Sequence, residues 1–244
     1  MITFNQQKPL MTNFTINALL TLVIIILGSL GCSDRSNSLI DSNTSTSQPE
    51  DNAFKILILG DSLTEGYGVM ESEAYPTLVQ NRLNLEISPK TRVVYDVING
   101  GITGSTTSGG VSRINWFLQA KPDFLILALG GNDGLRGIPV KETKQNLLTI
   151  LQTAKSHGIP TILTGMKIPP NYGPQYTNDF ANIFPSLAQS LKIPLIPFLL
   201  EGVGGNPKLN LPDRIHPNPA GHKIIGDLVF THLSQALVSI PSSL

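Results

Sequence analysis

The stretch Phe54–Gly66 reads FKILILGDSLTEG and decides the fold class. Its apolar run contains a single lysine and ends abruptly at Gly60-Asp61-Ser62, as a buried parallel strand does at the carboxyl edge of a sheet. Ligands of open α/β sheets bind outside that edge, so Ser62 stands where a nucleophile is useful. Taken alone, the motif has an equally simple explanation, in which Ser62 caps the following helix.

A second polar segment, near the other end of the chain, favours the nucleophile. Leu211–His222 reads LPDRIHPNPAGH, and its Asp213 and His216 are three residues apart. Side chains at that spacing on one helical turn face the same way. Asp213 can therefore hold one ring nitrogen of His216 and leave the other for Ser62, which needs a base to become nucleophilic. An isolated D-x-x-H is more often a surface pair, but together with a strand-end serine it predicts a Ser-His-Asp triad.

Two glycine-containing turns, each after another predicted strand, supply hydrogen-bond donors. They read NGGITG (99–104) and GGND (130–133). The Gly104 N–H and the Asn132 side-chain amide can donate to a developing oxyanion, with the Ser62 N–H as a third donor. Each turn alone is explained by turn and helix-cap chemistry. All the segments together predict an acyl-transfer site.

These segments resemble, in order, the four sequence blocks of the GDSL/SGNH hydrolase superfamily, over about 54–237. The resemblance is greatest to the bacterial arylesterase, acyl-CoA thioesterase I and lysophospholipase L1 group. Many relatives have aspartate directly after the oxyanion glycine, where this chain has Ser105. The four residues for which the superfamily is named correspond here to Ser62, Gly104, Asn132 and His216.

The resemblance implies a serine esterase that hydrolyses carboxylic esters or thioesters of short to medium acyl chains through an acyl-enzyme. The segment GMKIPPNYGP (165–174) resembles the loop above that group's acyl pocket. Its Ile168, Pro169 and Pro170 are candidates for substrate binding, although core packing beneath the loops explains them equally well. The alternatives are a carbohydrate O-deacetylase of the cell envelope and a non-catalytic envelope-binding module. The chemistry requires no cofactor and no metal.

Apolar periodicity alternates between strands and helices, which is typical of a doubly wound sheet. The resemblance implies a flavodoxin-like three-layer α/β/α sandwich with a five-stranded parallel sheet, in one domain over 54–240. The predicted strands lie near Lys55–Leu59, Val93–Ile98, Phe124–Leu129, Thr161–Thr164 and Leu195–Pro197. The predicted helices lie near Ala74–Asn84, Gly110–Gln119, Val140–Ser156, Gln175–Leu191 and Ala220–Val238.

Composition excludes other classes of function. The 244 residues are 41% apolar, enough for one sizeable core, and their formal net charge is zero without a basic stripe, so no nucleic-acid partner is expected. Four histidines and one cysteine show no metal-binding spacing. His222 lies close to His216 in the sequence and is the second choice as the base.

The N-terminal residues predict export. Residues 1–31 contain an apolar core too short for a comfortable membrane span and resemble a lipoprotein signal peptide that ends before Cys32, the only cysteine. Lipidation of Cys32 would anchor the protein to a membrane, and residues 32–53 are polar enough to form a flexible linker. We therefore expect a lipoprotein in the periplasm or outer membrane. Without lipidation, the protein would be periplasmic or secreted.

Overall fold

The computed structural model describes residues 53–238, so the predicted signal peptide, Cys32 and almost all of the predicted linker lie outside the described residues and stay predictions. Five parallel strands form one sheet, as predicted, and their order in the sheet is β2-β1-β3-β4-β5. They are β1 (Phe54–Gly60), β2 (Tyr95–Gly101), β3 (Phe124–Ala128), β4 (Thr161–Thr164) and β5 (Leu195–Ile196).

The register of the sheet aligns the carboxyl ends of three adjacent strands, β2, β1 and β3. Gly60 of β1 pairs with Gly101 of β2 on one side and with Ala128 of β3 on the other. The chain leaves β1 for β2 and then returns past β1 to β3, which puts the topological switch point at the carboxyl ends of β1 and β3. The segments that carry Ser62 and Asn132 begin at this point.

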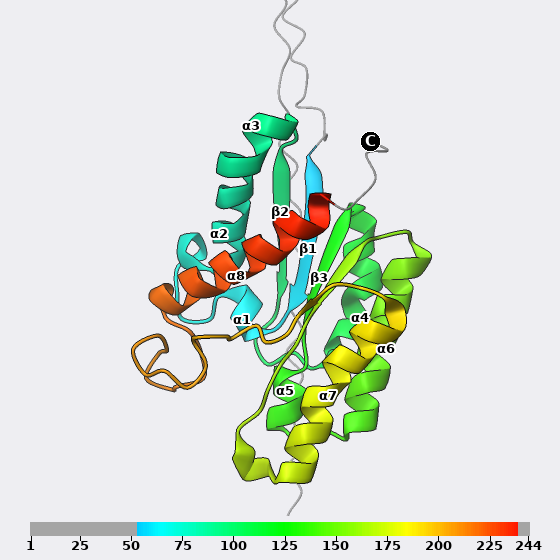
Figure 1. The fold of residues 1–244 in the computed structure, drawn as a ribbon, viewed down its shortest axis with the longest axis vertical. Helices are drawn as coiled ribbons and strands as arrows, with labels where there is room; N and C mark the ends of the chain where they lie inside the picture. Colours follow the sequence, from blue (N-terminus) through cyan, green and yellow to red (C-terminus); the bar gives the residue numbers. More distant parts are fainter. Residues whose placement is uncertain (1–52, 239–244) are drawn as a thin grey trace, which may run out of the picture. The chain divides into compact units, whose positions relative to one another are not determined.

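Helices cover the sheet in two groups (Figure 1). One group contains α2 (Tyr75–Arg82) and α8 (Pro219–Val238), and the other contains α4 (Thr107–Phe117), α6 (Val140–Ser156) and α7 (Pro174–Leu191). The result is the three-layer arrangement that the sequence predicts. The remaining helical segments are short: α1 (Ser62–Glu65), α3 (Ser88–Thr91), α5 (Gly131–Leu135), a π-helical turn at Leu83–Ile87, and 3₁₀ turns at Glu71–Glu73, Leu118–Ala120 and Pro170–Tyr172.

The sequence pattern explains why the longer elements form. Every residue of β3 is buried, as expected for a strand covered on both faces. Helix α6 buries Leu147, Ile150, Leu151 and Ala154, which recur at the spacing of one helical face. The short helices α1, α3 and α5 were not predicted from the sequence, because four or five residues are too few to show a period. No helix within residues 53–238 is long and apolar enough to cross a membrane.

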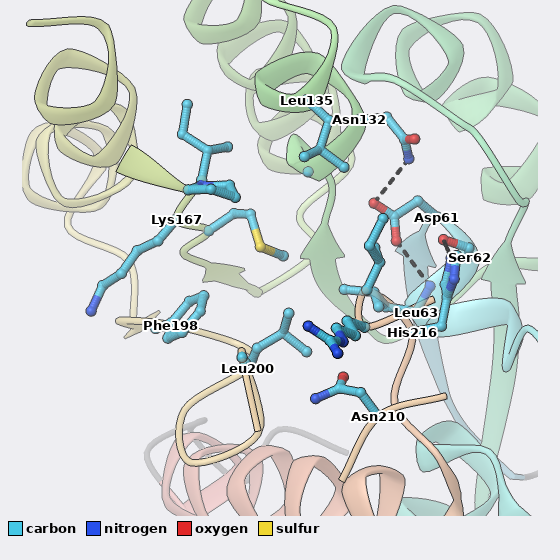
Figure 2. A pocket seen from close by; sticks show the side chains of 18 residues that line it. Asp61, Ser62, Leu63, Asn132, Leu135, Lys167, Phe198, Leu200, Asn210 and His216 are labelled. Carbon is cyan, nitrogen blue, oxygen red and sulfur yellow. Dashed lines mark hydrogen bonds between the residues drawn. The ribbon is translucent and has the colours of Figure 1, made fainter. Parts of the chain in front are cut away.

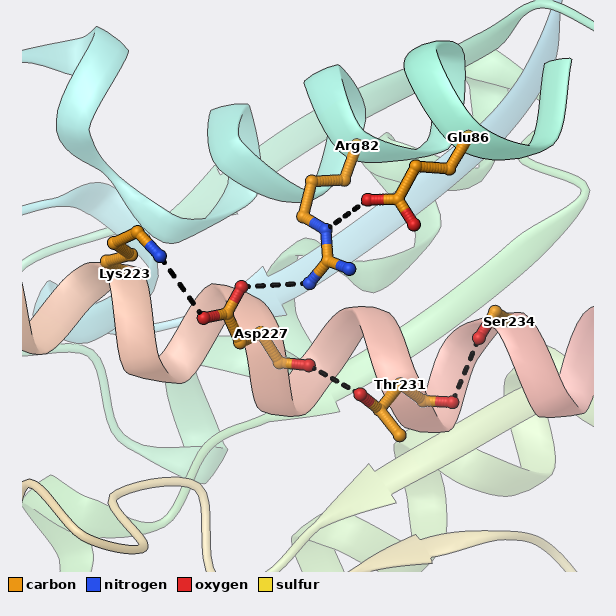
Figure 3. A network of polar contacts seen from close by, with 6 residues as sticks. All are labelled: Arg82, Glu86, Lys223, Asp227, Thr231 and Ser234. Carbon is orange, nitrogen blue, oxygen red and sulfur yellow. Dashed lines mark hydrogen bonds and ion pairs between the residues drawn. The ribbon is translucent and has the colours of Figure 1, made fainter. Parts of the chain in front are cut away.

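Charged side chains join the helices of one layer at the surface. Arg82 of α2 lies 2.8 Å from Glu86 and 2.8 Å from Asp227 of α8, and Lys223 lies 3.5 Å from the same aspartate (Figure 3). The Arg82 guanidinium also covers the ring of Phe230 at 3.8 Å. This group, the α2–α8 ion network, supports the helix that follows the predicted His216 segment.

Candidate active site

A tight turn places Ser62 at the carboxyl end of β1. The Asp61 side chain accepts a hydrogen bond from the Leu63 N–H at 3.0 Å and is the N-cap of α1, while Ser62 is the first residue of that helix. The alternative reading of the sequence, in which Ser62 itself caps the helix, is therefore wrong. A side chain at Gly60 would meet the Thr64 hydroxyl at 1.9 Å, so the turn requires glycine there.

Ser62, His216 and Asp213 form one chain of polar contacts. His216 Nε2 lies 3.0 Å from Ser62 Oγ, and His216 Nδ1 lies 2.8 Å from Asp213 Oδ2. An Nδ1–H donated to the carboxylate leaves Nε2 free to accept the hydroxyl proton of Ser62. The structure thus joins three residues that were selected from opposite ends of the sequence.

The Asp213–His216 segment is an irregular turn, and the expected helical turn is absent there. Arg214 has a left-handed backbone (φ 63°), and Asp213 Oδ1 accepts hydrogen bonds from the N–H groups of Ile215 (2.9 Å) and His216 (3.0 Å). Partial burial opposes ionisation of Asp213, but these N–H groups and the His216 ring outweigh it and lower its pKa to about 2. Asp213 is therefore a carboxylate at every pH at which the protein is expected to act.

Tyr67 is an aromatic neighbour that sequence reasoning missed. Its ring lies 4.4 Å from the ring of His216, centroid to centroid, at an angle of 38°. The Tyr67 side chain is about half exposed, so it covers one face of the imidazole at the surface. No motif marks this residue, because its contact depends on how the loop after α1 folds back.

The Asn132 amide lies between two segments of the site. Its Nδ2 donates to the Ser105 carbonyl at 3.0 Å and to Asp61 Oδ2 at 3.4 Å. Gly104, next to Ser105, has a left-handed backbone (φ 74°), and its carbonyl accepts a hydrogen bond from Arg136 at 2.9 Å. The structure therefore brings the two predicted oxyanion segments together.

One buried and one half-buried group hold the loop around Gly104 in place, and neither was predicted. Asp133 is fully buried and accepts hydrogen bonds from both the N–H (2.9 Å) and the hydroxyl of Thr107. Arg113 donates to the carbonyls of Gly60 and Gly100 and to the Ser105 hydroxyl. These contacts tie the loop to α5 and to the ends of β1 and β2. An aspartate after a GGN turn was the only available signal in the sequence.

A cavity of about 560 Å³ opens beside Ser62 and His216. Figure 2 shows apolar side chains gathered on its walls, away from the hydroxyl. Of the three candidates for substrate binding, Ile168 and Pro169 line this cavity, whereas Pro170 is exposed and outside its lining. The apolar side chains that line it are Leu63, Leu135, Met166, Ile168, Pro169, Phe198, Leu200 and Ile215.

His222, the second choice as the base, lies in the core. It is fully buried, its Nδ1 accepts a hydrogen bond from the Tyr75 N–H at 3.3 Å, and its Nε2 has no partner among the described residues. Burial lowers the pKa of His222 to about 4. It is His216 that contacts Ser62. Within residues 53–238, no group of three or more His, Cys, Asp or Glu side chains could hold a metal ion.

The fold and the arrangement of these groups define a class of hydrolase, and sequence comparison agrees. The chain matches the GDSL-like Lipase/Acylhydrolase family over residues 58–224. It belongs to this family, the GDSL/SGNH hydrolases, and its enzyme class is that of the carboxylic ester hydrolases.

Individual proteins of this family are similar to the chain over most of its length. The chain is 39% identical to the esterase TesA of Pseudomonas aeruginosa, over 68% of this chain and 80% of TesA. It is 37% identical to thioesterase 1/protease 1/lysophospholipase L1 of Escherichia coli, over 77% and 86% of the two chains. Among solved structures, the psychrotrophic esterase EstA from Pseudoalteromonas sp., inhibited by monoethylphosphonate, superimposes with a TM-score of 0.71. EstA is 32% identical, and the match covers 76% of this chain and all of EstA.

Proposed function

We propose that this protein is a serine esterase that hydrolyses carboxylic esters or thioesters of short to medium acyl chains through an acyl-enzyme. The observation that carries the proposal is the Asp213–His216–Ser62 chain, with contacts of 2.8 and 3.0 Å, at the wall of an apolar cavity. The relatives named as esterase and thioesterase support the same reaction class.

The chemistry follows from the protons that each group can hold. Ser62 Oγ attacks the ester carbonyl while His216 Nε2 takes its proton, and the Asp213 carboxylate stabilises the imidazolium that forms. His216 then gives the proton to the leaving alcohol or thiol, which leaves the acyl group on Ser62. Water attacks this ester with His216 again as the base, and the carboxylic acid departs.

The negative oxygen of each tetrahedral intermediate needs donors that are already in place. The proposal assigns this role to the N–H groups of Ser62 and Gly104 and to the amide of Asn132. Asn132 lines the cavity together with Ser62, and its amide is held by the Ser105 carbonyl, one residue after Gly104. Each such donor is typically worth about 10²–10³ in rate.

The shape and lining of the cavity support an acyl chain as the group that is bound. A volume of about 560 Å³ is within the ordinary range for small-molecule sites, and apolar side chains form most of its walls. Lys167, Asn210 and Arg214 add polar groups to the lining, but most of the surface that it presents is apolar, which suits an acyl chain better than a sugar ring. The cavity therefore favours acyl esters over acetylated carbohydrate.

The test is hydrolysis of p-nitrophenyl esters, from acetyl to palmitoyl, by the full chain, by Ser62→Ala and by the control Ser234→Ala. Ser234 lies near the C-terminal end of α8 and is not among the residues that line the cavity. We expect activity that peaks between butyryl and decanoyl, is unchanged in Ser234→Ala and is lost in Ser62→Ala without a change in the thermal unfolding midpoint. Activity confined to acetyl esters would favour a carbohydrate deacetylase. Near-normal hydrolysis by Ser62→Ala would refute the nucleophile.

A further inference from the structure

Asp61 is a buried carboxyl group for which the proposed reaction has no use. Its side chain is only 2% exposed, yet it lines the cavity beside Ser62. One oxygen, Oδ1, accepts the Leu63 N–H at 3.0 Å and caps α1. A serine or an asparagine would serve as well at an N-cap, so capping alone does not account for a buried charge at this position.

The second oxygen of Asp61 faces the predicted oxyanion donor. Oδ2 lies 3.4 Å from Asn132 Nδ2, and Figure 2 shows the carboxyl group between the Asn132 amide and the Leu63 N–H. A side chain at Gly131 would approach the same oxygen to 3.3 Å, so the carboxyl group also packs against the first turn of α5. Asp61 therefore bridges the nucleophile turn and the donor turn.

The amide nitrogen of Asn132 has two acceptors within hydrogen-bond distance, one close and one longer. The Ser105 carbonyl holds Nδ2 at 3.0 Å, and the Asp61 carboxylate holds it at 3.4 Å. Two acceptors on one side of the amide fix which end is nitrogen, because a flipped amide would turn its oxygen toward both of them. The longer contact, to Asp61, is the weaker one and can be shared with an oxyanion as it forms.

We propose that Asp61 is a positioning residue, which orients the Asn132 amide so that its N–H faces the oxyanion. This proposal rests on the proposed esterase function. Burial and the Asp133 carboxylate oppose ionisation of Asp61, whereas the Arg113 guanidinium and the His216 ring, when it is protonated, favour it. Ionised Asp61 accepts from Asn132, whereas protonated Asp61 offers a competing O–H.

The first test is Asp61→Asn, which keeps the size of the side chain. Asparagine has one acceptor oxygen, so either the Leu63 N–H or the Asn132 amide must lose its acceptor and meet an NH₂ group. We expect kcat for p-nitrophenyl butyrate to fall about 10- to 100-fold, less than the loss of the donor itself, with KM within about twofold. Asp61→Ser, which retains a cap but does not reach Asn132, should show the same loss.

The second test is a double-mutant cycle with Asn132→Ala, which should lose about 10²–10³ in kcat. If Asp61 acts through Asn132, adding Asp61→Asn to Asn132→Ala should cause less than about a threefold further loss. Asp227→Asn, an isosteric change in the α2–α8 ion network, is the matched control and should leave kcat unchanged.

Three results would overturn the inference: full kcat in Asp61→Asn or in Asp61→Ser, losses that multiply in the double mutant, or no effect of Asn132→Ala. Each of them leaves the esterase proposal intact as long as Ser62→Ala is inactive. Conversely, an active Ser62→Ala protein would refute the esterase mechanism before Asp61 is considered. Circular dichroism and thermal unfolding of each variant show whether a lost rate reflects a lost fold.

Discussion

The candidate active site and the α2–α8 ion network contain similar polar contacts in different surroundings. Asp213 lies 2.8 Å from His216, and Asp227 lies 2.8 Å from Arg82; the two carboxylate side chains are 38% and 48% exposed. Only the first pair continues, through His216 Nε2, to the hydroxyl of Ser62, a residue that is 7% exposed and lies beside an apolar cavity. A short contact of a carboxylate with a basic side chain therefore does not by itself indicate function. The groups to which that side chain is connected are more informative.

The largest expected effect is that of Asp213→Asn, which should separate the two networks sharply. An asparagine presents an amide to His216 Nδ1 and favours the wrong tautomer of the ring, so the base loses its free lone pair toward Ser62. We expect kcat to fall about 10⁴-fold, measured on p-nitrophenyl butyrate, against no change in Asp227→Asn. Equal, small effects of the two substitutions would mean that Asp213 is a surface residue like Asp227.

A smaller effect should appear in the pH dependence of stability, to which Asp61 in the candidate site and His222 in the core contribute with opposite signs. Burial raises the pKa of Asp61 from 3.8 to about 6, so the folded state binds this proton more tightly and gains stability as pH falls from 6 toward 4. Burial lowers the pKa of His222 from 6.5 to about 4, so the unfolded chain binds that proton first and stability is lost as pH falls from 6.5 toward 4. The two contributions, each on the order of 3 kcal/mol, nearly cancel.

Asp61→Asn removes the contribution of Asp61 to the pH dependence of stability and leaves that of His222. Urea unfolding between pH 8 and pH 4.5 compares the slopes of stability with pH, because at pH 8 the variant avoids burying a charge but loses one acceptor, for the Leu63 N–H or the Asn132 amide. On acidification, the variant should lose stability more steeply than the wild type, since His222 is then unopposed. Parallel curves for the two proteins would mean that the Asp61 carboxyl titrates as an ordinary exposed group.

The smallest expected effect is that of Asp227→Asn on stability. Its ion pairs are half exposed, and exposed pairs typically contribute about 0.2–1 kcal/mol, less at high salt. We expect the substitution to lower the free energy of unfolding by an amount within that range. This difference from the wild type should shrink in 1 M NaCl. A loss of several kcal/mol that salt does not change would show that the α2–α8 ion network carries much more of the fold than its exposure indicates.

The sequence predicted the long elements because they have a period or a continuous apolar run. Strand β4 and helix α6 have the predicted bounds, whereas β2 begins at Tyr95, later than predicted, and runs on through Gly101. The Asp213–His216 turn shows the limit of such reasoning, because the spacing suggested a helical turn and the contact arises from an irregular one. Local geometry that depends on one left-handed residue, Arg214, leaves no periodic trace.

The buried partners of the site were beyond prediction for a different reason. Asp61 and Asp133 are buried and Arg113 is half-buried, and all three lie in or near recognisable motifs. Their significance lies in contacts with segments 26 to 71 residues away. Pairing at that distance depends on how the strands are ordered and how the loops close, which a single sequence does not state. The two histidines differ in this respect: the sequence already ranked His216 above His222 as the base, and the fold adds that His222 is fully buried in the core.

The aligned carboxyl ends of β2, β1 and β3 also separate the loops by role. The proposed reacting groups come from the segments after β1, β2 and β3 and from the turn before α8, whereas much of the cavity wall comes from the segments after β4 and β5. Under the proposed function, substrate preference and bond-breaking chemistry would reside in separable pieces of one chain. Exchanging residues 166–169 or 198–205 for those of a relative offers a route to a new acyl preference on an unchanged catalytic frame.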